Sequence, residues 1–126
     1  MLFIYPAVIH DDPDGFWAEF PDLEGCTSQG EKLEEILSNA KEVMELFVLG
    51  LLEDGIAPPV PTRVKNLKIS DENAFPTLIE SNIDLAKNTK SVKKTLTIPA
   101  WLNERALSKN INFSQVLQEA LISKTI

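Results

Sequence analysis

Three short stretches near the start of the chain carry the pattern of β-strands: residues 2–9, 16–20 and 26–29. In the second stretch apolar side chains recur at every other position, which places them on one face of a strand. The stretches are separated by two runs rich in turn residues, Asp11-Asp12-Pro13-Asp14-Gly15 and Pro21-Asp22-Leu23-Glu24-Gly25. We therefore expect a three-stranded antiparallel meander, in which Pro6 is tolerated only at an edge or a bulge.

The longest periodic segment follows Gly30. Apolar residues between Leu33 and Leu52 recur at helical spacing and form one stripe, so this segment is predicted to be a helix that packs on the meander. Lys32, at the expected cap position, is a poor N-cap, and Asp54-Gly55 supplies the stop. Leu46 and Leu49 lie off the stripe. They are either simply exposed or part of a second contact, such as one between subunits.

The pattern weakens after this helix. Residues 57–61 form a proline-rich exit, and the Arg63 to Ala74 insert has few apolar anchors, which predicts an irregular or partly stranded segment. Residues 77–85 are predicted to be a fourth strand. The expected fold class is therefore α+β, with a β-β-β-α-β domain over residues 1–86. The small, polar residues 87–91 are the predicted hinge to a second domain over residues 92–126.

That second domain begins with a short strand, residues 93–98, in which Lys93, Thr95 and Thr97 face one way. Pro99 ends the strand and suits the first turn of a helix to about Lys109. Asn110 tolerates the left-handed conformation that ends helices. Asn112, followed three residues later by Gln115, is a capping-box arrangement that opens another helix.

One strand and two helices cannot close a core, because the strand has no partner and chains below roughly 40 residues seldom fold alone. Two copies that pair their strands antiparallel would share one core and leave a two-stranded polar ribbon, which fits the DNA major groove. A homodimer, or a higher oligomer built from it, is therefore expected. The predicted dimerisation residues are Leu96, Ile98, Leu102, Val116, Leu117 and Leu121.

The net charge of the chain changes sign near the same boundary. Residues 1–88 hold 17 acidic and 6 basic side chains, a net charge of −11, whereas residues 89–126 hold 2 and 6, a net charge of +4. An acidic domain attracts a basic partner, and a cationic one approaches phosphates. The chain has no long apolar run and no cationic start with a cleavage site, so we expect a cytoplasmic protein without a membrane partner.

Candidate catalytic chemistry is sparse. Five carboxylates between residues 11 and 22 could in principle hold two metal ions, but three of them lie in one turn, where Asp is favoured for local hydrogen bonding. His10 has no serine or cysteine at a motif spacing, and Cys26 is the single cysteine, best suited to packing. We predict no enzymatic activity, no metal and no cofactor. The five carboxylates are Asp11, Asp12, Asp14, Glu19 and Asp22.

The run GFWAEFPDLEGC at residues 15–26, followed by Gln29-Gly30 and an acidic helix start, resembles the HicB family of antitoxins. The resemblance implies a partly retained RNase H-like domain that binds and blocks HicA, a small mRNA-cleaving toxin. The candidate toxin-binding residues are Trp17, Glu19, Asp22 and Glu24.

The tail, IPAWLNERALSKNINFSQVLQEAL, resembles the ribbon-helix-helix form of the same family, which represses the operon for toxin and antitoxin by binding operator DNA. The resemblance implies that the ribbon reads bases and that the start of the second helix faces a phosphate. Lys94 departs from the pattern by lying on the inward side of the strand. It either precedes the paired part or reaches a phosphate. The implied DNA-binding residues are Lys93, Lys94, Thr95, Thr97, Asn112, Phe113 and Ser114.

Two classes of function fit these features: an antitoxin that also binds DNA, and a stand-alone ribbon-helix-helix repressor with an acidic sensor or assembly domain. The acidic domain favours the antitoxin, because a toxin that cleaves RNA must itself be basic to hold RNA.

Overall fold

A computed structural model describes residues 1–85 and 90–126 of the chain. The described residues fall into two compact units, one of residues 2–83 and the other of residues 84–126 with Met1. We call residues 2–83 the body and residues 84–126 the tail. Most of the predicted hinge, at residues 87–91, lies outside the described residues.

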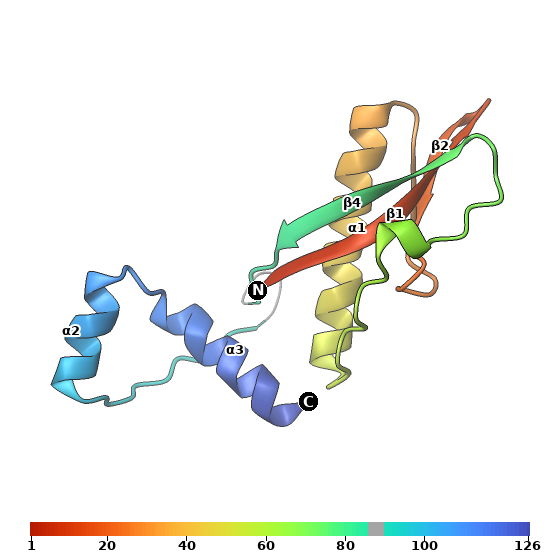
Figure 1. Ribbon diagram of the computed structural model, residues 1–126. Coiled ribbons are helices and arrows are strands. Elements are labelled where there is room, and N and C mark those ends of the chain that lie inside the picture. Colours follow the sequence, from red (N-terminus) through yellow and green to blue (C-terminus); the bar gives the residue numbers. More distant parts are fainter. Residues whose placement is uncertain (86–89) are drawn as a thin grey trace. The chain divides into compact units, whose positions relative to one another are not determined.

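A four-stranded antiparallel sheet forms the centre of the body (Figure 1). Its strands are β1 (Leu2–Asp12), β2 (Gly15–Glu19), β3 (Thr27–Gly30) and β4 (Ala74–Asn82), in the order β3-β2-β1-β4. The predicted meander is confirmed. The fourth strand begins and ends three residues earlier than predicted, because Ala74 and Phe75 already pair with His10 and Ile9 of β1.

The turn between β1 and β2 is tighter than predicted, since only Pro13 and Asp14 lie outside the strands. Asp12 pairs with Gly15, and the φ of Gly15 is 131°, a value that glycine adopts readily and other residues avoid. This tight turn fixes the register of the two strands. It places His10 directly opposite Trp17.

Pro6 lies in β1, a strand with neighbours on both sides, yet its missing N–H breaks no ladder. The pairing of β1 with β2 ends at Val8 opposite Glu19, so Pro6 has only β4 beside it. Backbone N–H groups in a strand point alternately to the two sides. Since Asp12 and Gly15 close a two-residue hairpin, the backbone N–H groups of the even-numbered residues of β1 point toward the β2 side. Position 6 lies beyond the end of β2, so an N–H there would have no partner strand. Pro6 therefore occupies the edge position that was predicted for it.

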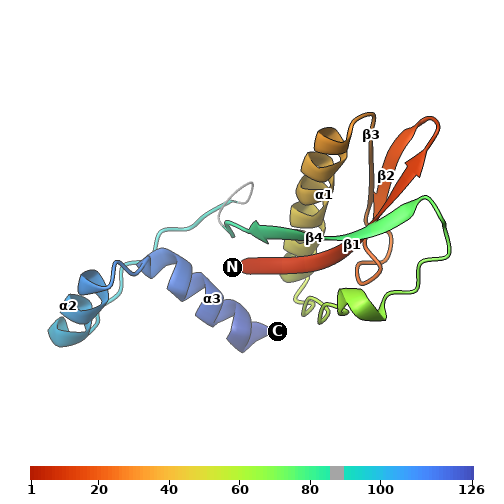
Figure 2. The ribbon, with the colours of Figure 1, turned by 45° about the horizontal axis from the view of Figure 1, so that its top comes forward.

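The helix α1 (Leu33–Glu53) covers one face of the sheet, as Figures 1 and 2 both show. Ile36, Ala40, Met44 and Val48 are fully buried at four-residue intervals, and each large side chain among them contributes about 1.5–3 kcal/mol through its burial. Lys32 makes no side-chain cap, and Gly55 follows the helix with a φ of 72°, as predicted. Leu46, off the buried stripe, is exposed.

The start of α1 packs closely on β3. A Cβ built on Gly30 would lie 2.9 Å from the backbone nitrogen of Ile36, so only glycine fits there. Asn39 of α1 also donates a hydrogen bond to the backbone oxygen of Gln29, at 3.0 Å. The sheet and the helix are therefore held together at the end of β3.

Residues 56–73, which we call the strap, lead from the end of α1 to the opposite face of the sheet (Figure 2). The strap contains one 3-10 turn, η1 (Val64–Asn66), and is otherwise irregular. On the opposite face Asp71 of the strap bonds to His10 of β1, and Asp22 accepts hydrogen bonds from Thr62. Tyr5 lies on the α1 face, and its hydroxyl donates to the backbone oxygen of Pro59, near the end of α1, at 2.6 Å. The Arg63 to Ala74 insert is thus irregular as predicted, except that Ala74 opens β4.

The tail contains α2 (Ala100–Ser108), close to its predicted limits, and α3 (Phe113–Thr125), which begins directly after the predicted cap. Asn110 has a φ of 55°, and the side-chain oxygen of Asn112 accepts the N–H of Gln115 at 3.0 Å, as the sequence predicts. Residues 93–98 form no strand within the single chain. No helix in the described parts of the chain has the length and apolar character needed to cross a membrane.

Candidate functional site

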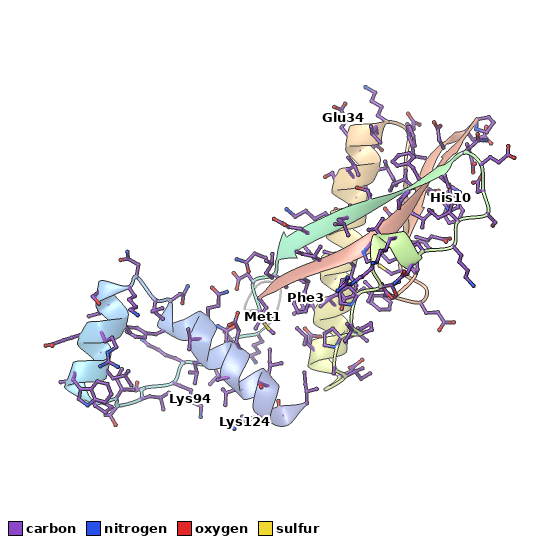
Figure 3. All side chains as sticks on the ribbon, in the orientation of Figure 1. Met1, Phe3, His10, Glu34, Lys94 and Lys124 are labelled. Carbon is purple, nitrogen blue, oxygen red and sulfur yellow. The ribbon has the colours of Figure 1, made fainter. Side chains whose placement is uncertain are left out.

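The body carries an aromatic pair on the sheet face opposite α1. His10 of β1 and Trp17 of β2 are opposite each other in the ladder, and their rings stack with centroids 3.8 Å apart and planes 6° from parallel (Figure 3 labels His10). The indole nitrogen of Trp17 donates a hydrogen bond to Oδ2 of Asp12, at 3.1 Å. The indole is therefore fixed on one face by the imidazole and at its nitrogen by a carboxylate.

Two further carboxylates lie beside the imidazole of His10. Oδ2 of Asp71 is 2.7 Å from Nδ1, and Oε2 of Glu19 is 3.7 Å from Nε2. The hydrogen bond from His10, reinforced by the backbone N–H of Asn73, holds the pKa of the Asp71 carboxyl below its usual value. Because an ionised carboxylate only accepts hydrogen bonds, Nδ1 of His10 is the donor of this hydrogen bond.

The other imidazole nitrogen is unusual. Nε2 of His10 has no hydrogen-bond partner among the described residues, and the residue is only 9% exposed. The distance to Glu19 is too long for a hydrogen bond. Glu19 is therefore not hydrogen-bonded to His10, and its side chain is 43% exposed.

The arrangement has the chemistry of a surface that binds cations. An aromatic ring and three carboxylates attract positive charge, and the hairpin adds Asp11 and Asp14, both exposed. Among the described residues, no three His, Cys, Asp or Glu side chains gather closely enough to hold a metal ion. Cys26 lies elsewhere in the body, and its burial raises the pKa of its thiol to about 11, so it serves packing rather than reactivity.

The structure brings together two of the four residues predicted to contact a toxin. Trp17 and Glu19 share one sheet face, since they lie two positions apart on β2. Both carboxylate oxygens of Asp22 are engaged by Thr62, with Oδ2 2.9 Å from the backbone nitrogen and Oδ1 2.6 Å from Oγ1. Asp22 therefore anchors the strap. Glu24 lies exposed in the turn after β2.

Asp71 is the residue that sequence reasoning missed. His10 has no partner nearby in the sequence, and Asp71 follows it by 61 residues, inside an insert with weak periodicity. One signal was present. Residues 5–10 are all buried, and they read as an almost continuous apolar run, the pattern of a strand covered on both faces.

In the tail, the predicted ribbon residues lie in an extended segment without secondary structure, which includes Lys94 (Figure 3). Lys93, Thr95 and Thr97 are exposed, as are Leu96 and Ile98. At the start of α3, the cap oxygen of Asn112 is occupied by Gln115. The N–H groups of Phe113 and Ser114, in the first turn, have no acceptor within the helix.

Neither tail helix buries a single residue within the described chain. Leu96 is 64% exposed and Leu121 is 55% exposed, and the other predicted dimerisation residues are exposed or half-buried. Exposed apolar side chains in such number are typical of an interaction surface. The exposed large apolar residues of the tail are Val92, Leu96, Ile98, Trp101, Leu102, Leu107, Ile111, Phe113, Val116, Leu121 and Ile126.

Comparison with known proteins identifies a family. The model of a HicB-like antitoxin of bacterial toxin-antitoxin systems matches residues 5–122. An uncharacterised 14.9 kDa protein from the rep-hol intergenic region of Haemophilus phage HP1 is 31% identical over 103 residues, which are 81% of this chain and 77% of the phage protein.

Solved structures agree with this match. A chain of a toxin-antitoxin complex from Streptococcus pneumoniae is 28% identical with a TM-score of 0.62, over 98% of this chain and 99% of that chain. A chain of the HicA3 and HicB3 toxin-antitoxin complex is 28% identical with a TM-score of 0.52, over 65% and 99%. The antitoxin HicB of Burkholderia pseudomallei shares the fold, at 22% identity and a TM-score of 0.68, over 98% and 99%.

Proposed function

Because the chain belongs to the family of HicB-like antitoxins of bacterial toxin-antitoxin systems, we propose a division of labour between its two units. The body, an RNase H-like domain without catalysis of its own, binds and inhibits a HicA-type mRNA-cleaving toxin. The tail dimerises as a ribbon-helix-helix domain and binds operator DNA, which represses the operon for toxin and antitoxin. The protein acts in the cytoplasm.

The charge of the body supports the first role. The body has 16 acidic and 5 basic side chains, a net charge of −11, and a toxin that holds RNA must be basic, so the body draws the toxin to itself. The surface covered in this way is the one that the toxin uses for RNA. Inhibition therefore needs only exclusion of the substrate. Two solved relatives come from toxin-antitoxin complexes, which is consistent with such a partner.

The apolar surface of the tail is the observation that carries the second role. Two copies that pair residues 93–98 would enclose Leu96 and Ile98 together with the apolar side chains of α2 and α3. Lys93, Thr95 and Thr97 would then project from the ribbon toward base edges. Lys94 reaches a phosphate in this arrangement, and the N–H groups of Phe113 and Ser114, behind the Asn112 cap, bind another.

One full-length variant separates the two roles. Leu96→Asp places a charge in the shared core, so the variant should sediment as a monomer and fail to retain operator DNA. It should still silence the toxin and co-purify with it, because the body is unchanged. The matched control is Val60→Asp, which adds the same charge at an exposed position of the strap and should leave both roles intact.

Two results would contradict the proposal. A Leu96→Asp protein that remained a dimer and bound the operator normally would remove the ribbon from the mechanism. If the wild-type protein captured no small basic protein encoded beside it, and gave no protection against that protein in cells, the toxin-neutralising role would be wrong.

A further inference from the structure

We propose that Trp17, with the carboxylates of Asp12 and Glu19 at its margins, forms a receptor for one arginine side chain of the basic partner protein. This inference rests on the proposed function in one respect, namely that the partner is the toxin. The geometry of the receptor is a property of the body alone.

The indole of Trp17 is held in a fixed position, and we call it the platform. One of its faces lies parallel to the imidazole of His10, which Asp71 holds at 2.7 Å, and its nitrogen is bound to Asp12. Its other face is turned away from β1, toward β3, where the paired residue is Gln29. The β3 sequence, Thr-Ser-Gln-Gly, offers no apolar side chain to cover an indole. Trp17 accordingly remains partly exposed.

Two carboxylates border this platform. In the ladder, Asp12 lies two positions from His10 along β1, and Glu19 lies two positions from Trp17 along β2, so all four side chains share one face. Within the described parts of the chain the exposed Asp12 carboxylate accepts the indole N–H alone, which leaves lone pairs for another donor.

The unpartnered nitrogen of His10 is a second, independent indication of a missing ligand. Nε2 is buried, has no hydrogen-bond partner among the described residues and lies 3.7 Å from Oε2 of Glu19, beyond hydrogen-bond distance. Glu19 can therefore accept hydrogen bonds from a cationic donor that approaches from outside. An anion at the same place would meet the carboxylates of Glu19 and Asp12 and be repelled.

The shape of the platform selects arginine over lysine. A guanidinium is planar, stacks on an aromatic face and carries five N–H donors in a fixed fork, so it can lie on the indole while its edges reach the carboxylates. A lysine ammonium is compact and reaches only one of these partners well. The tail contains the same pairing, since the guanidinium of Arg105 lies 4.9 Å from the ring centre of Trp101.

The test uses the full-length Trp101→Phe protein, in which Trp17 is the only tryptophan and its fluorescence reports on the platform alone. N-acetyl-arginine amide should change the emission in a saturable way. N-acetyl-citrulline amide, which has the same shape without the charge, should bind at least tenfold more weakly. Glu19→Gln should weaken the arginine response severalfold. Glu42→Gln, an equal change of charge on the exposed side of α1, should not.

An equal fluorescence response to the arginine and citrulline amides would contradict the proposed arginine receptor. Equal losses of the arginine response in Glu19→Gln and Glu42→Gln would contradict it as well. A second measurement concerns the toxin. Trp17→Leu should weaken its binding to the full-length protein at least tenfold, and Trp17→Phe, which keeps an aromatic ring beside His10, should weaken it less. Circular dichroism checks that both variants are folded.

The two measurements also separate this inference from the proposed function. If the wild-type protein binds the toxin and folded Trp17→Leu binds it equally well, the receptor is wrong and the antitoxin role stands. If the wild-type protein binds no toxin, the antitoxin role is wrong, and the titration with the arginine and citrulline amides still decides whether the receptor exists.

Discussion

The carboxylate of Asp71 lies 2.7 Å from Nδ1 of His10, although 61 residues separate them in the chain. Through this contact the strap positions the imidazole on which Trp17 stacks. A residue in an irregular segment thus determines how an aromatic side chain on the neighbouring strand is presented.

The first prediction concerns this contact and pH. The folded protein lowers the pKa of Asp71, so the contact stabilises the fold above the ordinary Asp value of about 3.9 and is lost as the pH falls through the lowered value. Asp71→Asn should therefore unfold at lower urea concentration than wild type at pH 7, and the difference should shrink on acidification below that ordinary value. Asp14→Asn, in the exposed turn, is the control and should show no such trend.

The second prediction concerns the anchor of the strap. Asp22→Ala removes both hydrogen bonds to Thr62 and should cost about 1 to 3 kcal/mol of unfolding free energy. Burial, and after it the charge of Asp22, raises the pKa of Tyr5, so the same variant should bring that pKa closer to normal. Tyr5 is the only tyrosine, which makes its ultraviolet titration unambiguous. A pKa unchanged by Asp22→Ala would show that the charge is too distant to act.

The third prediction compares one substitution at two glycines. Gly30→Ala pushes a methyl group against the backbone of Ile36 and should destabilise the body, because the start of α1 must move away from β3. Gly50→Ala, inside α1 with open space around it, should stabilise the body by about 0.5 to 1 kcal/mol through helix propensity. Thermal unfolding of both variants would measure this. Changes of the same sign would contradict the packing described for Gly30.

The fourth prediction concerns the start of α3. Asn112→Ala removes the cap that accepts the N–H of Gln115 and should cost the tail about 0.5 to 2 kcal/mol. Asn112→Ser keeps a capping oxygen and should restore most of this loss. Helical circular dichroism during denaturation provides the measurement, and equal stability of the alanine and serine variants would show that the cap contributes nothing.

Local rules predicted much of this fold. The limits of α2 and the start of α3 follow from Pro99, Asn110 and Asn112, because each of these residues has a conformational or hydrogen-bonding preference that acts within a few positions. The limits of α1 follow in the same way from its apolar stripe and from Gly55.

Contacts between distant segments could not be predicted in this way. Phe75 and Pro76 belong to β4 because they meet β1, and nothing adjacent to them in sequence indicates this. This limit affected the prediction of the candidate site most. Glu19 and Trp17 are recognisable from the motif that contains them, but the partner of His10 lies in the strap, whose path across the sheet depends on Thr62 and Asp22.

Pro6 bears on a different property, resistance to aggregation. Beyond Val8, one flank of β1 has no paired strand among the described residues, and an open flank is a template on which another chain can add a strand. Leu2 and Ile4 are exposed in this part of β1, and an added strand would gain stability by burying them. A proline cannot donate the hydrogen bond that an incoming strand requires. This one residue therefore limits intermolecular strand addition at a place where the sheet would otherwise grow.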